Sequence, residues 1–582
     1  MKAFGPVLEF AWGKAILALF IAIFMFLIFP SCRQSMPEFV MHIPMRDGTR
    51  LSTSILLPGK QNEKYPLVLI RTPYKKENRI AEYRYLTENG YAIAVQDVRG
   101  RFSSQGDFNP FTKESEDGFD TINWLARQEW CNGNIGMIGS SYNGFVQYSA
   151  AIEQPPALKT IIPNVAMVDP FEAGIYVNGI FLPNSLLWCA ILEDRESTEE
   201  IQRKNWGRLL DHTPISELDF LIFSKKIDYF QQWTNHDLKD SFWRQDSHFE
   251  KLSLIQIPVF IQTGWFDSQM QGNIRAYQEL RNSGNRNIKL IVGPWGHSDT
   301  ESNTYQGDFM ENGDSISLKG AYLRWLNYWL KGEDNGVMNE PLVQLYVLNS
   351  SHWHHDSVYT QGALFNLFLN SSGNEGKRID NPAELNFSMA KELSPAFDSF
   401  TYNPAHTTKF DESMLSRRNG EALQKMLTGR NDYVIYTTDA LKEDKILSGE
   451  ASVKFYASST TKDTDWFAIL LSLDSNNNIN GTIGMTALRA RFRNGFDKLE
   501  LLSVDSVHEY DLKFSHPATK IAEGQRIGLI ITSSWNYPLY GKNLNTGQNN
   551  QTTERSEIAG QRIHHSLKYP SRIVLRLLQT SR

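Results

Sequence analysis

The chain has 582 residues, of which 41% are hydrophobic and 21% are charged, and its formal net charge is −6. This length exceeds what one hydrophobic core usually spans, so two or three domains are expected, and the composition excludes both wholesale disorder and a polytopic membrane protein. Because no block of lysine and arginine offsets the slightly acidic charge, nucleic acid is not expected as a partner.

The first 35 residues have the pattern of an export signal. Lys14 precedes an apolar run over 15–29, which is short for a spanning helix and suits the hydrophobic region of a signal peptide. A serine precedes Cys32, which resembles the processing site of bacterial lipoproteins, where the cysteine is acylated. We therefore predict a signal at 1–35 and an exported protein that is periplasmic or anchored in the membrane by Cys32. Simple secretion with cleavage nearby, and an uncleaved anchor helix, are alternatives.

Two further cysteines, Cys131 and Cys189, are too few for a disulfide framework in a protein of this size. One bridge is possible, but two buried free thiols fit better. No Cys-x-x-Cys spacing occurs, so a cysteine-based metal site is not predicted.

Strand-like and helical patterns alternate from about residue 36 to residue 349, which is typical of a parallel sheet covered by helices. In chain order, the patterns predict a hairpin at 40–57 about an Asp-Gly turn, strands at 66–70 and 91–95, a helix at 116–128, a strand at 135–138 and a helix from Phe145. We predict an α/β-hydrolase core in two parts, 36–167 and 253–361.

The strand pattern lapses between residues 168 and 252, where charged stretches rich in Trp and Leu predict helices at 197–210 and 219–233. We interpret this segment as a helical cap over the carboxyl edge of the sheet. Strands return at 257–262 and 288–292, and a long helix is predicted at 318–331.

The pattern changes again beyond residue 361, where short alternating runs rich in β-branched residues are separated by Gly, Asn and Asp clusters. Examples are the runs at 452–457, 466–473, 527–532 and 571–577. This pattern predicts an all-β jelly-roll domain over 362–582.

Ser141, Asp267 and His297 each follow a predicted strand, in that chain order. A serine hydroxyl is a poor nucleophile at neutral pH, so it needs a base within hydrogen-bond reach and a carboxylate that fixes the tautomer of that base. The order Ser, acid, His at successive strand ends is that of α/β-hydrolases. The sequence therefore predicts a catalytic triad of these three residues.

At these residues the chain resembles the cocaine-esterase-like acyl hydrolases, which are similar to the X-prolyl dipeptidyl peptidases, the glutaryl-cephalosporin acylases and the α-amino-acid ester hydrolases. The resemblance covers nearly all of the mature chain. It rests on six motifs in family order, namely Met45-Arg46-Asp47-Gly48, Arg71-Thr72-Pro73-Tyr74, Gln96-Asp97-Val98-Arg99-Gly100-Arg101, Gly139 to Gly144, Gly264 to Asp267, and Gly293 to His297.

The resemblance implies an α/β-hydrolase core, a helical cap and a C-terminal jelly roll packed against the active site. It also implies an oxyanion hole formed by the hydroxyl of Tyr74 and the backbone N–H of Tyr142. Trp265 and Trp295 adjoin the predicted catalytic residues, so they are candidate walls of a substrate pocket, with core packing as the alternative. No cofactor is required by this chemistry.

Two other charged groups have structural explanations. We interpret Asp97, Arg99 and Arg101 as an ion-pair network that braces a loop rather than as substrate contacts. The segment 352–356, with three histidines and an aspartate, suggests a metal site, but its distance from the triad in sequence favours a solvated loop between domains. We predict no metal.

The amino-acid ester hydrolases of this family hold the substrate ammonium with carboxylates, two of which lie two and three residues after the catalytic aspartate. Here these positions are Gln269 and Met270, which carry no charge. The sequence therefore favours a small-molecule ester or amide with a neutral acyl group, cleaved through an acyl-enzyme. The alternatives are an X-Pro dipeptidyl peptidase, and a surface lipoprotein that binds a ligand on a non-catalytic hydrolase scaffold.

Overall fold

The computed structural model describes residues 38–193, 211–297, 317–350, 352–359, 362–371, 379–389, 396–407, 420–535 and 539–578. The predicted signal at 1–35 and the predicted helix at 197–210 lie outside these ranges. Within them, every helix is too short or too polar to cross a bilayer. Cys131 and Cys189 are both buried free thiols, as predicted.

The N-terminal half contains a ten-stranded sheet in the order β1-β2-β4-β3-β5-β6-β9-β10-β11-β12. Neighbours from β4 to β11 are parallel, whereas β1, β2 and β12 are antiparallel additions at the two edges. The strands are β1 (Glu38–Pro44), β2 (Arg50–Leu56), β3 (Tyr65–Thr72), β4 (Ala92–Asp97), β5 (Cys131–Ser140), β6 (Leu158–Asn164), β9 (Val259–Gly264), β10 (Ile288–Gly293), β11 (Val343–Val347) and β12 (His352–Asp356).

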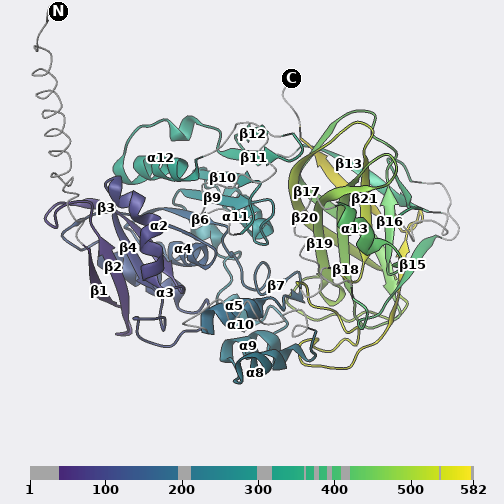
Figure 1. Cartoon of the computed structure of the whole chain (residues 1–582), viewed down its shortest axis with the longest axis horizontal. Coiled ribbons are helices and arrows are strands. Elements are labelled where there is room, and N and C mark those ends of the chain that lie inside the picture. Colours follow the sequence, from purple (N-terminus) through teal and green to yellow (C-terminus); the bar gives the residue numbers. More distant parts are fainter. Residues whose placement is uncertain are drawn as a thin grey trace, which may run out of the picture.

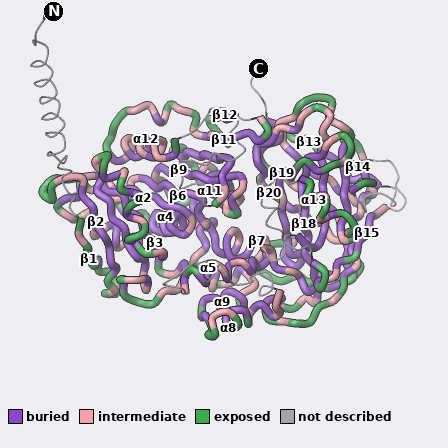
Figure 2. The backbone as a smooth tube through the Cα atoms, in the orientation of Figure 1, coloured by how far each residue is buried: buried purple, intermediate pink, exposed green. Residues whose placement is uncertain are grey.

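Helices cover both faces of this sheet, so its central strands are buried throughout, as Figure 2 shows. On one face lie α2 and α12, which meet where the Lys331 ammonium donates to the Asn89 carbonyl at 2.8 Å. On the other face α3 packs against α4, and α4 and α11 both pack on the turn at Leu252–Leu254. The helices are α2 (Lys76–Glu88), α3 (Glu114–Leu125), α4 (Tyr142–Ile152), α11 (Met270–Asn282) and α12 (Leu318–Lys331). This is the predicted α/β-hydrolase core.

A group of short elements between β6 and β9 lies at one side of the core, beside the C-terminal domain (Figure 1). These elements are β7 (Tyr176–Val177), β8 (Ile180–Phe181), α5 (Ser185–Glu193), α8 (Leu218–Phe223), α9 (Asp228–Asn235) and α10 (Ser241–Arg244). The helix predicted at 219–233 is therefore two helices. The chain turns at Ser224, which has a left-handed φ of 56°, and the Asp219 carboxylate accepts the N–H of Ile227 at 2.7 Å across the break.

The C-terminal domain is mostly β, with an eleven-stranded sheet and a core of its own. Ten strands follow one hydrogen-bonded path, and β20 pairs with β17 off this path. All of its neighbouring strands are antiparallel except β14 and β16. The elements are β13 (Ala363–Asn370), β14 (Ala383–Asn386), β15 (Phe397–Tyr402), α13 (Gly420–Leu427), β16 (Tyr433–Thr437), β17 (Lys445–Ser459), β18 (Asp465–Leu473), β19 (Ile479–Arg489), β20 (His508–Ile521), β21 (Arg526–Thr532), β22 (Ala559–His564) and β23 (Arg572–Leu577).

A buried arginine joins this domain to the cap. Arg491 is 1% exposed, and its guanidinium binds the buried Asp463 carboxylate at 2.7 Å and the Asp237 carboxylate of the cap at 3.4 Å. It also donates to the carbonyl of Gln548 at 2.6 Å. The buried guanidinium of Arg491 thus has an ion-pair partner in the cap and another in the β domain. Separating the two domains would remove one of these partners.

Replacing Arg491 by Met is expected to lower the free energy of unfolding by about 3 to 5 kcal/mol, because Asp463 would remain buried without its cation. Urea denaturation followed by fluorescence measures the change. The control is Arg555→Met, which removes the exposed pair with Glu557 and should change stability by less than about 1 kcal/mol. Equal losses in the two variants would contradict the role given to the buried pair.

Candidate active site

Ser141 occupies a sharp turn between β5 and α4. Its backbone has φ 59° and ψ −121°, a region that costs a non-glycine residue roughly 1 to 3 kcal/mol. The N–H of Ser141 donates to the Asn164 carbonyl at 2.9 Å, which holds the turn against the end of β6. The serine is therefore presented at the N-terminus of α4, where the first backbone N–H groups have no acceptor within the helix.

The two glycines of this turn are required by close contacts. A Cβ on Gly139 would lie 2.6 Å from the Cβ of Asn143, and one on Gly144 would lie 2.5 Å from the Cβ of Ala166. Both distances are far shorter than a van der Waals contact. The packing of α4 on the strand ends therefore explains why glycine stands two residues before Ser141 and three residues after it.

Asp267 and His297 meet across the loops that follow β9 and β10. Two backbone hydrogen bonds join these loops, from the N–H of Trp265 to the Gly293 carbonyl at 2.8 Å and from the N–H of Phe266 to the Trp295 carbonyl at 3.0 Å. The Nδ1 atom of His297 lies 3.0 Å from Oδ2 of Asp267.

The environments of the two side chains differ. The Asp267 side chain is fully buried, whereas 43% of the His297 side chain is exposed. The other carboxylate oxygen of Asp267 accepts the N–H of Gln269 at 2.6 Å. Each oxygen of the Asp267 carboxylate therefore has a hydrogen-bond partner in the protein, whereas the imidazole of His297 is partly exposed.

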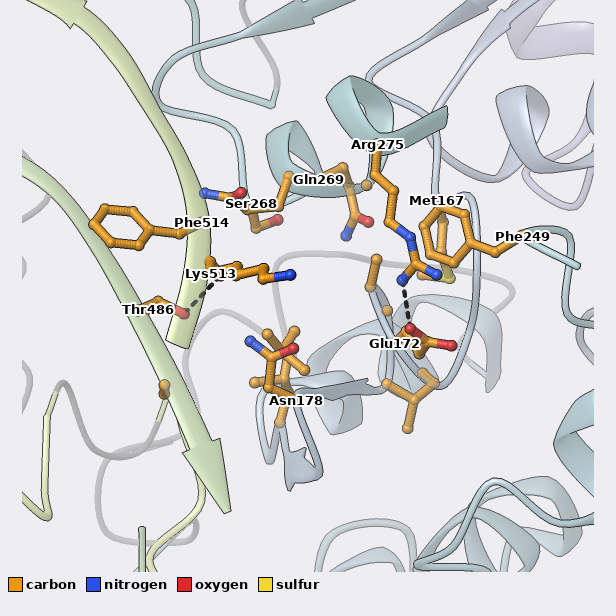
Figure 3. A pocket seen from close by; sticks show the side chains of 18 of the residues that line it. Met167, Glu172, Asn178, Phe249, Ser268, Gln269, Arg275, Thr486, Lys513 and Phe514 are labelled. Atoms are coloured by element: carbon orange, nitrogen blue, oxygen red, sulfur yellow. Dashed lines mark hydrogen bonds and ion pairs between the residues drawn. The ribbon is translucent and has the colours of Figure 1, made fainter. Parts of the chain in front are cut away.

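Ser141 and His297 line one cavity of about 1640 Å³, together with Tyr74 and Tyr142. The core supplies these residues, the cap supplies residues such as Glu172 and Asn178, and the β domain supplies others such as Thr486 and Lys513. Figure 3 shows side chains from all three parts facing one another across this space. No single domain encloses the site.

Tyr74 lines this cavity together with Ser141. The indole N–H of Trp188, in α5, donates to the Tyr74 hydroxyl oxygen at 2.9 Å. Burial raises the pKa of Tyr74, and the neighbouring Trp188 N–H and Ser141 hydroxyl act in the opposite direction. The tyrosine is thus a neutral hydroxyl held beside the serine.

Tyr142 is the first residue of α4, and its side chain is anchored away from the serine. Its hydroxyl donates to the Glu114 carboxylate at 2.9 Å and accepts the N–H of Phe111 at 2.8 Å. Burial raises the pKa of Glu114 to about 7, against the opposing effect of Arg71 at 2.8 Å. This anchoring fixes the backbone of Tyr142 next to Ser141.

Comparison with known proteins agrees with this arrangement. The model of the X-Pro dipeptidyl-peptidase S15 family matches residues 47–299, and the model of the X-Pro dipeptidyl-peptidase C-terminal non-catalytic domain matches residues 335–574. Cocaine esterase of Rhodococcus sp. is 27% identical over 92% of this chain and 98% of its own length.

Two solved structures share the fold with a TM-score of 0.80. An aminopeptidase from a marine-sediment Thaumarchaeota archaeon is 24% identical, with 94% of this chain and 97% of that chain covered. An α-amino acid ester hydrolase is 22% identical, with 93% and 96% covered. The chain thus carries a domain of the X-Pro dipeptidyl-peptidase S15 family, followed by the C-terminal domain of these peptidases. Like the family, it is an enzyme that cleaves a carboxylic ester or amide.

The match to the C-terminal non-catalytic domain model, at 335–574, begins before the β domain does. Strands β11 and β12, at 343–356, pair with β10 in the sheet of the core, and β13 at 363–370 is the first strand of the C-terminal sheet. In the described structure the change of sheet thus falls between residues 356 and 363.

Trp265 and Trp295 lie in the core of this hydrolase and are absent from the cavity lining. Trp265 is fully buried, and its indole N–H donates to the Tyr346 carbonyl at 2.7 Å. Trp295 is 7% exposed and packs against Trp353 with a ring distance of 5.8 Å. Both placements agree with core packing, the alternative to a substrate-binding role.

The ion-pair network predicted for Asp97, Arg99 and Arg101 is present in part. Asp97 accepts the backbone N–H of Lys76 at 2.8 Å and binds its ammonium at 3.3 Å. Arg99 binds Asp47 at 2.7 Å and Asp117 at 2.6 Å. Arg101 instead donates to backbone carbonyls, those of Pro73 and Leu192. The first of these bonds braces the segment that leads to Tyr74.

The histidine-rich segment 352–356 is not an inter-domain loop, as the sequence suggested, but the edge strand β12, paired with β11. Alternation in this strand places His355 on the opposite face from His352 and His354. Among the described residues, no group of three His, Cys, Asp or Glu side chains is placed to hold a metal ion.

Several cavity residues were missed by the sequence reasoning, notably Trp188, Glu172 and Arg275. The latter two form an ion pair that faces the cavity in Figure 3. Trp188 and Glu172 belong to the cap, and Arg275 belongs to α11. Whether these side chains point toward the site depends on how the cap packs on the core. The abundance of Trp in the cap was the one available signal, and it did not indicate which indole faces the serine.

Behind Ser141, helix α4 packs on a buried histidine. The His248 ring stacks on Phe145 with centroids 4.2 Å apart, and its Nε2 lies 3.0 Å from the Ser149 hydroxyl. Burial lowers the pKa of His248 to about 3. The imidazole is therefore neutral in the folded protein over the whole physiological range.

This histidine predicts a loss of stability in acid. Its folded pKa lies below the usual 6.5, so its contribution is complete above pH 6.5 and is lost as the pH falls from 6.5 toward 3. At pH 5 the loss is about 2 kcal/mol relative to pH 7.5. We therefore expect the free energy of unfolding, measured by urea denaturation, to change less between these two pH values in His248→Gln than in the parent protein. The two changes should differ by about 2 kcal/mol. An unchanged difference would contradict the assignment.

Proposed function

We propose that this chain is an esterase or acylase in which Ser141 is the nucleophile, His297 the general base and Asp267 the group that orients the imidazole. The hydroxyl of Tyr74 and the N–H of Tyr142 form the oxyanion hole. One observation carries the proposal. The His297 imidazole, paired with a buried carboxylate at 3.0 Å, opens onto the same cavity as Ser141 and Tyr74.

The proposed cycle has two halves. His297 takes the proton of Ser141 as the serine oxygen attacks the carbonyl carbon, and then gives that proton to the leaving alcohol or amine as the acyl-enzyme forms. A water molecule, activated by the same imidazole, then hydrolyses the acyl-enzyme. In both halves Tyr74 and the N–H of Tyr142 donate to the carbonyl oxygen as negative charge develops on it.

The acyl group is proposed to be neutral. Gln269, two residues after Asp267, lines the cavity and carries no charge. Glu172 also lines it, but its carboxylate binds both Arg275 and Lys239. Burial raises the pKa of Glu172, yet these two cations outweigh burial and the pKa is lowered. Its charge is thus compensated within the protein, and a substrate ammonium would find no free counter-ion there.

Aromatic residues near Tyr74 support an apolar acyl group. The ring of Trp188 stacks on that of Trp233 at an interplanar angle of 5°, and it contacts the rings of Tyr142 and Phe111 with centroids 5.8 and 5.6 Å away. Of these, Trp188 and Tyr142 line the cavity directly. A benzoyl or similar group would bury apolar surface against them.

A substrate panel tests the proposal on the purified protein. Turnover of 4-nitrophenyl acetate and 4-nitrophenyl benzoate is compared with that of Gly-Pro-4-nitroanilide, and a fluorophosphonate probe reports the reactive serine. We expect labelling and preferential ester cleavage. Preferential cleavage of the anilide would identify the alternative, an X-Pro dipeptidyl peptidase, and absence of labelling would favour a non-catalytic, ligand-binding lipoprotein.

Export is proposed on the sequence alone. The apolar run at 15–29, followed by Cys32, supports a protein that is periplasmic or held at the membrane through an acylated cysteine. Expression with radiolabelled palmitate in a bacterial host tests this. Incorporation that is lost in Cys32→Ser would support acylation, whereas a mature N-terminus without lipid would support simple secretion.

A further inference from the structure

The hydroxyl oxygen of Tyr74 accepts a hydrogen bond from the cap. The indole N–H of Trp188 donates to it at 2.9 Å. A tyrosine hydroxyl has one proton to donate and accepts through its oxygen, whereas an indole nitrogen only donates. Trp188 therefore occupies an acceptor site of Tyr74, and the hydroxyl proton has to point elsewhere.

The direction left to that proton is set by the surroundings of Tyr74. Tyr74 lines the same cavity as Ser141. With Trp188 on one side of its oxygen, the hydroxyl proton is left to point into this cavity, where the carbonyl oxygen of a substrate attacked by Ser141 would become negative. A donor fixed in advance needs no reorientation during the reaction.

The indole itself is firmly held. Trp188 stacks on Trp233 with an interplanar angle of 5° and a centroid distance of 5.8 Å, and Trp233 is 1% exposed. Trp188 comes from α5 in the cap, whereas Tyr74 follows β3 of the core. The cap thereby contributes a rigid polar contact to the catalytic face of the core.

We propose that Trp188 is a positioning residue, which orients the Tyr74 hydroxyl as an oxyanion donor and increases its donor strength through the hydrogen bond to its oxygen. The inference rests on the oxyanion role proposed for Tyr74. It makes the cap part of the catalytic apparatus, beyond any role as a wall of the substrate pocket. The direction in which this bond acts on the pKa of Tyr74 agrees, because it opposes the effect of burial.

The variant Trp188→Phe keeps an aromatic ring in the stack, removes the N–H and shortens the ring, and the control below accounts for the shortening. We expect kcat to fall about threefold to tenfold, as for the loss of one net hydrogen bond, with KM little changed. The loss should be the same for 4-nitrophenyl acetate and 4-nitrophenyl benzoate, because the oxyanion is common to both. A wall of the acyl pocket would instead change KM, and more for the benzoate.

A double-mutant cycle with Tyr74→Phe gives the decisive measurement. Tyr74→Phe alone should lower kcat by about 10²-fold or more. Adding Trp188→Phe to it should cause no further loss, because the group through which the indole acts is already absent. Additive losses would overturn the positioning role. Unchanged kcat in Tyr74→Phe alone would instead overturn the oxyanion role in the proposed function.

Trp233→Phe is the matched control. It shortens the other ring of the same stack and leaves the Trp188 N–H and Tyr74 in place, so kcat should stay within about twofold of the parent enzyme. A loss equal to that of Trp188→Phe would show that packing of the stack, rather than the N–H, is responsible. Circular dichroism and the melting temperature of each variant establish that all four proteins are folded.

Discussion

Replacing Ser141 by Ala is expected to lower kcat for 4-nitrophenyl esters by about 10⁵- to 10⁶-fold, because the reaction loses the atom that forms the acyl-enzyme. The cavity should persist, since the backbone turn at Ser141 is held by its N–H bond to Asn164 and not by the hydroxyl. The measurement is steady-state turnover combined with fluorophosphonate labelling, and both signals should disappear together.

Ser268→Ala is the matched control for this prediction. Ser268 lines the same cavity, and nothing in the proposed cycle uses its hydroxyl. This variant should retain labelling and turnover within a few fold. Ester hydrolysis that survives at the parent rate in Ser141→Ala would exclude the proposed mechanism, whatever the behaviour of the control.

Alanine at position 141 also relieves no strain, since a left-handed φ is unfavourable for alanine as well as for serine. The variant should therefore be no more stable than the parent. Glycine at this position tolerates the same backbone, so Ser141→Gly should be equally inactive and more stable by up to about 1 kcal/mol. This comparison separates the chemical role of the hydroxyl from the conformational cost of the turn.

The core of the site could be predicted because it depends on local patterns. Ser141, Asp267 and His297 each follow a buried strand, and the carboxyl ends of parallel strands meet at one edge of a sheet. Strand identity and chain order were therefore enough to bring Asp267 and His297 together. The sequence could not supply the backbone bonds between their two loops, which fix the 3.0 Å contact.

Side-chain direction was harder to predict than position along the chain. Trp265 and Trp295 adjoin the predicted catalytic residues in sequence, yet their rings pack into the core, where the Trp265 N–H finds the Tyr346 carbonyl. Trp188, far from any motif, faces Tyr74. Adjacency in sequence gives the position of a residue, whereas the packing of neighbouring elements decides which way its ring turns.

The cavity walls depend on contacts between domains. Thr486 and Lys513 reach the cavity only because the β domain docks beside the cap, where Arg491 pairs with Asp237. No periodicity in the sequence encodes such docking.

The helix predicted at 219–233 is interrupted for a local reason. A side-chain bond from Asp219 to the N–H of Ile227 competes there with the helical backbone.

Replacing Asp267 by Asn is expected to lower kcat by about 10⁴-fold, while the fold stays intact. The buried carboxylate accepts from Nδ1 of His297, which leaves Nε2 unprotonated and able to take the serine proton. An asparagine amide of the same shape can donate to Nδ1 instead and favour the opposite tautomer. Because Oδ1 of Asp267 also accepts the Gln269 N–H, the oxygen of the amide would be drawn to that donor, which directs its NH₂ toward the imidazole.

The control for this variant is Asp356→Asn, another carboxylate that lines the cavity but lies on the edge strand β12. It should change kcat by less than about threefold. Turnover above pH 9 gives a second readout for Asp267→Asn, since hydroxide can partly replace the missing base and activity should rise more steeply with pH than in the parent. A loss below tenfold at neutral pH would mean that Asp267 does not orient His297, and another carboxylate would have to be sought.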